Sequence, residues 1–329
     1  MRIGLTFDLR SAWIAEGYTP EETAEFDSEV TIDALAAAIA AHGHQVDRIG
    51  HARQLVARIA AGDRWDLVFN ICEGLRGIAR EAQVPAILET YSIPYTFADP
   101  LVAALTLHKG LTKTVVAAAG IPTTPFAVIA SLDQLRELSL PFPLFAKPLA
   151  EGTGKGISAA SKISDAAALE RAVTRLIAEF QQPVLVETFL PGREFTVSLL
   201  GTGAATEVLG TIEIILLHGA EAEVYSYINK EQSEQLVECR PVTAADPVVA
   251  EAERIAVAAW QTLNCRDSGR VDLRCDAEGR PNFMEVNPLA GLHPTHSDLP
   301  ITATAVGWTY EKLIGRILES AFERVLPRM

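Results

Sequence analysis

Short apolar runs alternate with amphipathic segments along the first 98 residues of the chain. The short runs predict strands, and apolar positions that recur every three or four residues predict helices. The predicted strands are Ile3–Phe7, Gln45–Ile49, Leu67–Asn70 and Pro94–Phe97, and the predicted helices are Ser28–Ala41, Ala52–Ala60 and Glu81–Tyr91. Such alternation is typical of a parallel sheet covered by helices. We therefore expect residues 1–98 to form a Rossmann-like α/β lobe.

A second lobe is expected over residues 99–182, opening with two helices, Pro100–Leu107 and Lys109–Ala119. Gly120 and Pro122 then stop the second helix. The pattern that follows predicts the strands Phe126–Ile129, Pro143–Lys147 and Ile157–Ser161 and the helices Leu132–Leu138 and Asp165–Phe180.

A third lobe over residues 183–329 is expected to contain an antiparallel sheet. Its predicted elements are the strands Val184–Glu187, Glu194–Leu200 and Glu207–Leu217, the hairpin Arg270–Asn287, and the helices Pro247–Leu263 and Tyr310–Val325. The polar stretch Ser226–Thr243 shows no clear period and is interpreted as a functional loop. The fold class is therefore α/β, with a parallel first lobe and antiparallel strands in the third.

Composition narrows the classes of function. The 329 residues include 28 basic and 42 acidic side chains, a net charge of −14, which argues against a general partner of nucleic acids or anionic membranes. The segment Met1–Asp8 lacks the apolar core of a signal peptide, and the alanine-rich run Ala34–Ala41 is too short to span a bilayer. With four scattered cysteines and no CxxC pair, the chain is expected to be a reduced, cytoplasmic protein.

The predicted C-terminal hairpin concentrates polar side chains. Because side chains alternate between the faces of a strand, Arg270 and Asp272 point the same way, as do Glu285 and Asn287. Carboxylate and amide oxygens are hard ligands that suit magnesium carried on phosphates. A solvated hairpin with a polar outer side would show the same pattern, so these residues alone leave both interpretations open.

The glycine-rich segment Glu151–Gly156 fits neither of the common nucleotide motifs. A P-loop would need glycine where Leu149 stands and Ser or Thr at its last position, and the third glycine of a dinucleotide fingerprint would fall on Ile157. A flap that closes over phosphates and a plain β-turn remain equal interpretations. Lys147 ends an apolar strand just before this turn and Lys109 opens a helix, so each is a candidate phosphate ligand or a solvated surface lysine.

Taken in order, these segments resemble the ATP-grasp superfamily and, within it, the D-alanine–D-alanine ligase family. The similarity extends over nearly the whole chain. It rests on Glu81 with Leu88-Glu89 and Ile93-Pro94-Tyr95-Thr96, Lys109 with Lys113, Gly120-Ile121-Pro122-Thr123, Lys147-Pro148 with Glu151-Gly152 and Gly156, Gly192-Arg193-Glu194-Phe195-Thr196-Val197, Gly269-Arg270-Val271-Asp272, and Glu285-Val286-Asn287 with Gly291.

The resemblance implies an ATP-grasp fold with a central lid lobe, and an ADP-forming carboxylate–amine ligase that works through an acyl phosphate, as a homodimer. It also implies a role for individual residues. The ATP phosphates would be bound by Lys109, Lys147, Lys230, Thr153 and Gly154, and adenine and ribose by Glu187, Leu190 and Glu194. Two magnesium ions, or manganese ions in their place, would be bound by Asp272, Glu285 and Asn287. The reacting oxyanion would be stabilised by Arg270 and Gly291, Lys230 would also be catalytic, and Ser226–Thr243 would form the lid.

The chain departs from the family pattern at the amino-acid sites. Where the family has a glutamate, a serine and a tyrosine around the first substrate, this chain has Asp27, Thr153 and Glu231. The loop after Asn287 is one residue longer and carries His293 and His296, although Ser297 still matches the serine that receives the second substrate's carboxylate. One hypothesis is that Glu231, together with Asp27 or the two histidines, fits a first or second substrate other than D-alanine, such as one with an extra amine. The alternative, that Glu231 pairs with a surface lysine on an adaptable lid, explains the change equally well.

Two other functions fit the same residues. One is a ligase for a different amino-acid or carboxylate pair in a specialised pathway, and the other is a catalytically silent ATP-binding sensor. Arg270 argues against the sensor, because by the resemblance it serves amide formation more than ATP binding.

Overall fold

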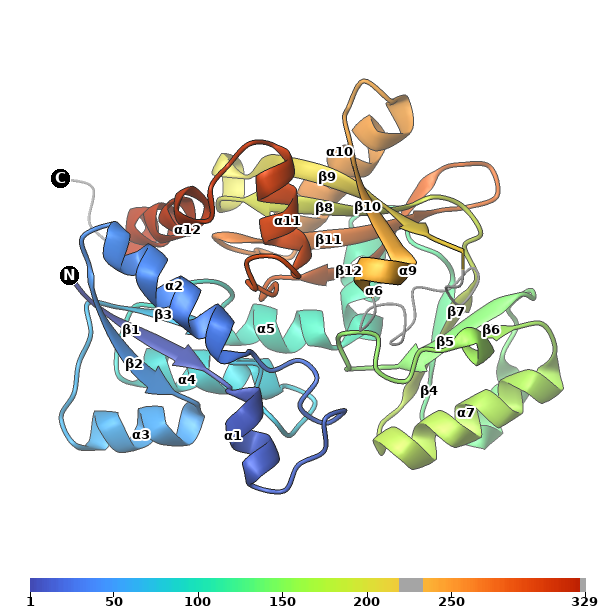
Figure 1. Ribbon diagram of the computed structural model, residues 1–329. Helices are drawn as coiled ribbons and strands as arrows, with labels where there is room; N and C mark the ends of the chain where they lie inside the picture. The colour runs from blue at the N-terminus through green and yellow to red at the C-terminus, as the bar shows by residue number, and fades with distance from the viewer. Residues whose placement is uncertain (219–232, 326–329) are drawn as a thin grey trace.

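The N-terminal lobe is a three-stranded parallel sheet with helices around it. The computed structural model describes residues 1–218 and 233–325, so the predicted sites at Lys230 and Glu231 lie outside the described residues. The sheet has the order β2-β1-β3 and all its pairings are parallel, as the sequence predicts. Its elements are β1 (Arg2–Phe7), α1 (Arg10–Ala15), α2 (Glu29–Ala41), β2 (Gln45–Gly50), α3 (Ala52–Ala60), β3 (Leu67–Ile71) and α4 (Gln83–Thr90) (Figure 1).

The segment after α4 was expected to be a fourth strand. This segment pairs with β3 through a single parallel bridge between Val68 and Tyr95. The Val68 amide donates to the Pro94 carbonyl at 2.8 Å, and the Thr96 amide donates to the Val68 carbonyl at 3.0 Å. The extended backbone was therefore predicted correctly, but the pairing is too short to count as a strand.

The central lobe is a four-stranded sheet backed by one long helix. Its strand order is β4-β7-β5-β6, all antiparallel, and the helix α7 packs its apolar face on it. The elements are β4 (Phe126–Ile129), β5 (Leu144–Pro148), β6 (Lys162–Ile163), α7 (Ala166–Phe180) and β7 (Val184–Thr188). The predicted strand over residues 157–161 is wrong: Gly154 and Gly156 both have φ of 74°, and the turn they make leads into a 3-10 helix, Ala159–Ser161.

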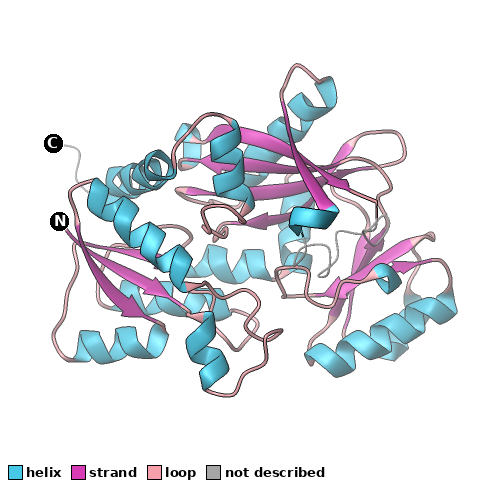
Figure 2. Ribbon diagram, viewed as in Figure 1, coloured by secondary structure: helices cyan, strands magenta, loops and turns pink. Residues whose placement is uncertain are grey.

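The C-terminal lobe is a five-stranded antiparallel sheet of order β10-β9-β8-β11-β12. Its strands are labelled in Figure 1 and coloured magenta in Figure 2. Its elements are β8 (Glu194–Leu200), β9 (Glu207–Leu216), α9 (Ser233–Leu236), β10 (Val237–Val242), α10 (Pro247–Thr262), β11 (Ser268–Cys275) and β12 (Pro281–Asn287). The last part of the predicted loop 226–243 is thus a strand. Val237 is buried with Ile212 and Ile214, and this short apolar contact is too local to give the sequence a visible period.

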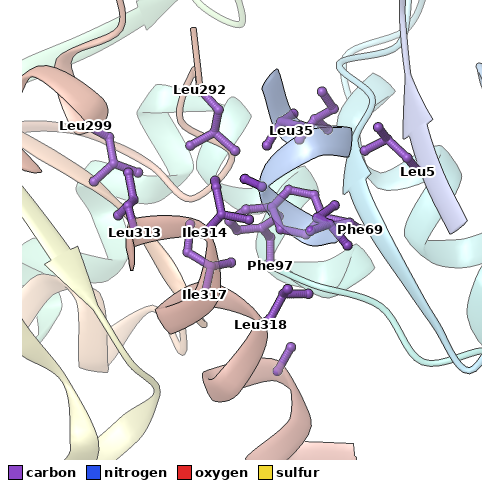
Figure 3. Close-up of a cluster of buried hydrophobic side chains, with 14 of the residues drawn as sticks. Leu5, Leu35, Phe69, Phe97, Leu292, Leu299, Leu313, Ile314, Ile317 and Leu318 are labelled. Carbon is purple, nitrogen blue, oxygen red and sulfur yellow. The ribbon is translucent and has the colours of Figure 1, made fainter. Parts of the chain in front are cut away.

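Hydrophobic cores cross the predicted lobe boundaries. The helices α11 (Asp298–Ala305) and α12 (Tyr310–Val325) bury Leu299, Ile314 and Leu318 in one cluster with Leu5 and Phe69 of the N-terminal sheet (Figure 3). The helices α5 (Pro100–Leu107) and α6 (Lys109–Ala118) join the core of the C-terminal sheet. The strand predicted at 184–187 was expected in the third lobe, but it is β7 and pairs with β4 and β5 of the central sheet. The boundaries at 98 and 182 stay predictions, and the shared cores hold the lobes in one arrangement.

The observed architecture is that of the predicted α/β class, with a parallel sheet in the first lobe and antiparallel sheets elsewhere. Among the described residues, no helix has both the length and the apolar character that crossing a membrane requires.

Candidate active site

The β11–β12 hairpin places its four predicted polar residues on one face. Arg270 pairs with Asn287 and Asp272 with Glu285 in the strand register. The Asp272 carboxylate is fixed on both oxygens: Thr196 Oγ1 donates to Oδ1 at 2.9 Å, and Asn287 Nδ2 donates to Oδ2 at 3.2 Å. The Arg270 guanidinium also forms an ion pair with Oδ2. A buried carboxylate held in this way is a fixed anchor for a cation or for the guanidinium beside it.

Two lysines from different elements meet at this hairpin. Lys109 is the first residue of α6 and Lys147 lies in β5, yet their Nζ atoms lie 3.6 and 3.7 Å from the same Glu285 Oε2 atom. Both lysines are buried, with 8% and 3% of their surface exposed, so their charges are poorly screened by water. The fold therefore brings Lys109 and Lys147 together beside the hairpin. The sequence had left open whether either lysine is a phosphate ligand.

Glu187 lies behind these lysines as the anion of a buried triad. Lys113 Nζ lies 2.8 Å from Glu187 Oε2, and Lys147 Nζ lies 3.2 Å from Oε1. Burial by itself would raise the pKa of Glu187, but the two lysines lower it below its ordinary value. The predicted contact with adenine or ribose stays a prediction for Glu187, Leu190 and Glu194; Leu190 is buried, and Glu194 lies 3.2 Å from Arg274 Nη1.

The glycine-rich turn after β5 is tied to the N-terminal lobe by Glu25. The Gly152 amide donates to Glu25 Oε1 at 2.5 Å, while Arg80 and Lys155 lie 2.7 and 3.3 Å from Glu25 Oε2. Burial would raise the pKa of Glu25, but Arg80 and Lys155 lower it to about 2. A Cβ atom at residue 152 would lie 2.4 Å from Glu25 Oε1, so glycine is needed for this approach.

Glu25 was not identified from the sequence, which pointed to Asp27 in the same segment. Asp27 is half-buried, and its pKa is raised to about 7, mainly by burial. Its backbone pairs with Asp8 and Arg10, and the contacts described for it include no residue of the turn. The substrate role of Asp27 stays a prediction. Nothing in the local pattern separated the two acids, because the contact that distinguishes Glu25 spans 127 positions.

The loop after β12 folds back on itself through Ser297. Its Oγ accepts a hydrogen bond from the His293 amide at 3.0 Å, and a Cβ atom at Gly291 would lie 2.7 Å from that oxygen. The rings of His293 and His296 lie 4.5 Å apart, and burial followed by the charge of His296 lowers the pKa of His293. Ser297 thus lies against Gly291, the predicted oxyanion donor.

A pocket of about 110 Å³ connects these parts. Segments of all three lobes line it, and the predicted residues among its walls are Lys109, Thr153, Arg270, Glu285, Asn287 and Gly291. A larger pocket of about 610 Å³ shares Glu25 and Glu151 with it but includes neither Arg270 nor Glu285. The smaller pocket is therefore the candidate active site, because it combines Lys109 with the hairpin residues Arg270, Glu285 and Asn287.

The fold and the site define an ATP-dependent ligase of the ATP-grasp class. The family model of the D-ala D-ala ligase C-terminus matches residues 115–319. A D-alanine–D-alanine ligase of Bordetella petrii is 35% identical over 271 residues, 82% of this chain and 79% of the relative. An uncharacterized protein of Sinorhizobium fredii, y4sG, is also 35% identical, over 78% of this chain and 75% of its own length.

Solved structures agree on the fold. The D-alanine–D-alanine ligase of Bacillus anthracis complexed with ATP superposes with a TM-score of 0.74 and 23% identity, covering 98% of each chain. The VanG D-Ala:D-Ser ligase of Enterococcus faecalis gives a TM-score of 0.73 and 20% identity, covering 97% of this chain and 99% of its own. The chain belongs to the D-alanine–D-alanine ligase family, and it is an ATP-dependent ligase that joins amino acids.

Proposed function

We propose that the protein is an ADP-forming ligase that joins two amino acids through an acyl phosphate. The observation that carries the proposal is the meeting of Lys109 and Lys147 at Glu285, next to the fixed Arg270–Asp272 pair. The lysines supply positive charge where phosphates need it, and Arg270 supplies a donor where an oxyanion needs one.

The reaction has two balanced steps. A carboxylate oxygen of the first amino acid attacks the γ-phosphorus of ATP, and the bond to the bridging oxygen breaks to release ADP. The deprotonated amine of the second amino acid then attacks the acyl carbon, inorganic phosphate leaves, and the new amide nitrogen loses a proton. In this proposal Lys109 and Lys147 bind the phosphates, while Arg270 and the Gly291 amide stabilise the tetrahedral oxyanion, with each such donor contributing about 3–4 kcal/mol.

Magnesium is the metal that we assign to this site. Asp272, Glu285 and Asn287 offer two carboxylates and an amide oxygen, the hard donors that magnesium on phosphates prefers. When bound, the metal would neutralise charge on the phosphates during transfer.

Phosphate release is the direct test. Purified protein is incubated with ATP, magnesium and pairs of amino acids, and phosphate and product mass are measured. We expect release that requires both amino acids, and a loss of about 10²–10³ in kcat in the Arg270→Met variant with ATP binding retained. An exposed control, Arg136→Met, should behave as the unchanged protein. Turnover that is independent of amino acids, or ATP binding without turnover, would refute the proposal.

The homodimer and the cytoplasmic location are parts of this proposal that rest on the family resemblance. Light scattering of the purified protein and fractionation of cells that express it test these two statements separately.

A further inference from the structure

Two glutamates from the N-terminal lobe reach the wall of the active-site pocket. Glu73 follows β3 after one intervening residue, and Glu81 lies in the 3-10 helix Arg80–Ala82. Both line the 110 Å³ pocket together with Arg270, Glu285 and Asn287. They therefore face the space in which the proposed chemistry takes place, although neither belongs to the phosphate or metal positions.

The other carboxylates of this pocket are already paired with cations. Glu25 lies 2.7 Å from Arg80 and 3.3 Å from Lys155, and Glu151 lies 2.7 Å from Lys155. Glu285 has the two lysines described above. Within residues 1–218 and 233–325, by contrast, the structure shows no hydrogen bond or ion pair to the side chain of Glu73 or Glu81.

The two unpaired carboxylates also repel each other. Burial is the largest cause that raises the pKa of Glu73, and the charge of Glu81 is the next. Arg80 precedes Glu81 directly in the sequence, but its guanidinium is directed to Glu25 and, at 2.7 Å, to the Ala150 carbonyl. Half-buried carboxylates without a partner carry a desolvation cost, which a cationic ligand would offset.

We propose that the carboxylate donor of the reaction is a small diamino acid, whose two ammonium groups bind Glu73 and Glu81. This inference rests on the proposed function and names its substrate class. With its ammonium groups on the N-terminal wall, the donor's carboxylate faces Arg270 and the hairpin, where phosphoryl transfer takes place. Alanine brings one ammonium group and would leave one carboxylate unpaired. The pocket volume of about 110 Å³ restricts the side chain to a short one.

The test compares donors in the unchanged protein and in matched variants. Alanine, 2,3-diaminopropionate and 2,4-diaminobutyrate, each as D and L forms, are supplied with ATP, magnesium and a panel of second amino acids, and kcat/KM is obtained from phosphate release. We expect a diamino acid to exceed alanine at least tenfold. Glu73→Gln and Glu81→Gln should each lower that preference at least tenfold. Glu16→Gln, an exposed glutamate of the same lobe, should keep the preference.

The outcomes separate this inference from the function on which it rests. Alanine as the preferred donor, or an undiminished diamino-acid preference in both variants, overturns the inference and leaves the ligase proposal standing. Absence of amino-acid-dependent turnover overturns both. If the variants fail to fold, as thermal unfolding would show, the donor preference of the unchanged protein decides the matter.

Discussion

Arg270 Nη1 lies 3.4 Å from Asp298 Oδ2, so the guanidinium proposed to stabilise the oxyanion faces a second carboxylate besides Asp272. Arg270 and Asp298 expose only 16% and 17% of their side chains, so the pair is weakly screened. Asp298 opens α11 directly after Ser297, the residue matched to the second substrate's carboxylate. A carboxylate at this place opposes the binding of another one.

Replacing Asp298 should therefore favour second substrates that carry a free carboxylate. In Asp298→Asn we expect the KM for such an amino acid to fall about fivefold, the equivalent of about 1 kcal/mol, while the KM for ATP stays unchanged. Steady-state kinetics with an α-amino acid and with its carboxamide derivative measure the effect. Asp133→Asn, at an exposed site, is the control. An equal change for the two substrates would contradict the prediction.

Lys113 is expected to contribute mainly to stability. Its side chain is fully buried, and among residues 1–218 and 233–325 its removal in Lys113→Met would leave Glu187 with Lys147 as its one ion-pair partner. Breaking a buried pair on one side costs about 3–5 kcal/mol. Thermal unfolding of the ATP-free protein should show a clear decrease in Tm, whereas Lys312→Met, at an exposed position, should show little change. Equal Tm values for the two variants would argue against the buried triad.

Gly152 is expected to control closure of the glycine-rich turn. In Gly152→Ala the new methyl group would displace Glu25 and weaken its charge-assisted hydrogen bond to the residue 152 amide, worth about 1.5–3 kcal/mol. We expect the KM for ATP to rise about tenfold or more. In the Glu25→Ala background the same substitution should raise the KM for ATP by less than about threefold, because the side chain that clashes with the new methyl group is absent. Additive effects would show that the contact does not hold the turn.

Ionisation of Glu81 should make donor binding depend on pH. The pKa of Glu81 is raised to about 7, and burial is the largest cause. The charge of Glu25 also raises this pKa, whereas the charges of Arg80 and Lys109 lower it. The carboxylate of Glu73 repels that of Glu81. Below pH 7 the Glu81 carboxyl group is mostly neutral. Because a cationic amino-acid donor binds the ionised carboxylate better, binding should strengthen as the pH rises. The KM for a diamino donor should then fall about tenfold between pH 6 and pH 8. The Glu81→Gln variant should lose this dependence; a profile identical to that of the unchanged protein would refute the assignment.

Much of the fold was predictable because it depends on local patterns. Apolar periodicity located the parallel strands, the long helices and the β11–β12 hairpin, and strand alternation put Asp272 and Glu285 on one face. The short helix α1, the helix α11 and the strand β10 were missed, since each is too short, or too closely followed by a turn, to show a full period. The glycines 154 and 156 suggested a hairpin turn that continues as a strand over residues 157–161, whereas the chain leaves this turn as the 3-10 helix Ala159–Ser161.

The sequence by itself determined the class of chemistry, since Lys109, Lys147, Arg270, Asp272, Glu285 and Asn287 occur in an order that resembles the ligase family. Only the tertiary structure decided which of these side chains meet, and it added two acids that no motif marked, Glu25 on the turn and Glu73 on the pocket wall. It also placed Glu81 on that wall, a residue that the resemblance had marked without giving it a role. The physical reason is distance along the chain. Periodicity reports the face on which a residue lies, whereas contacts between lobes follow from how buried apolar surfaces pack, and no single segment encodes that packing.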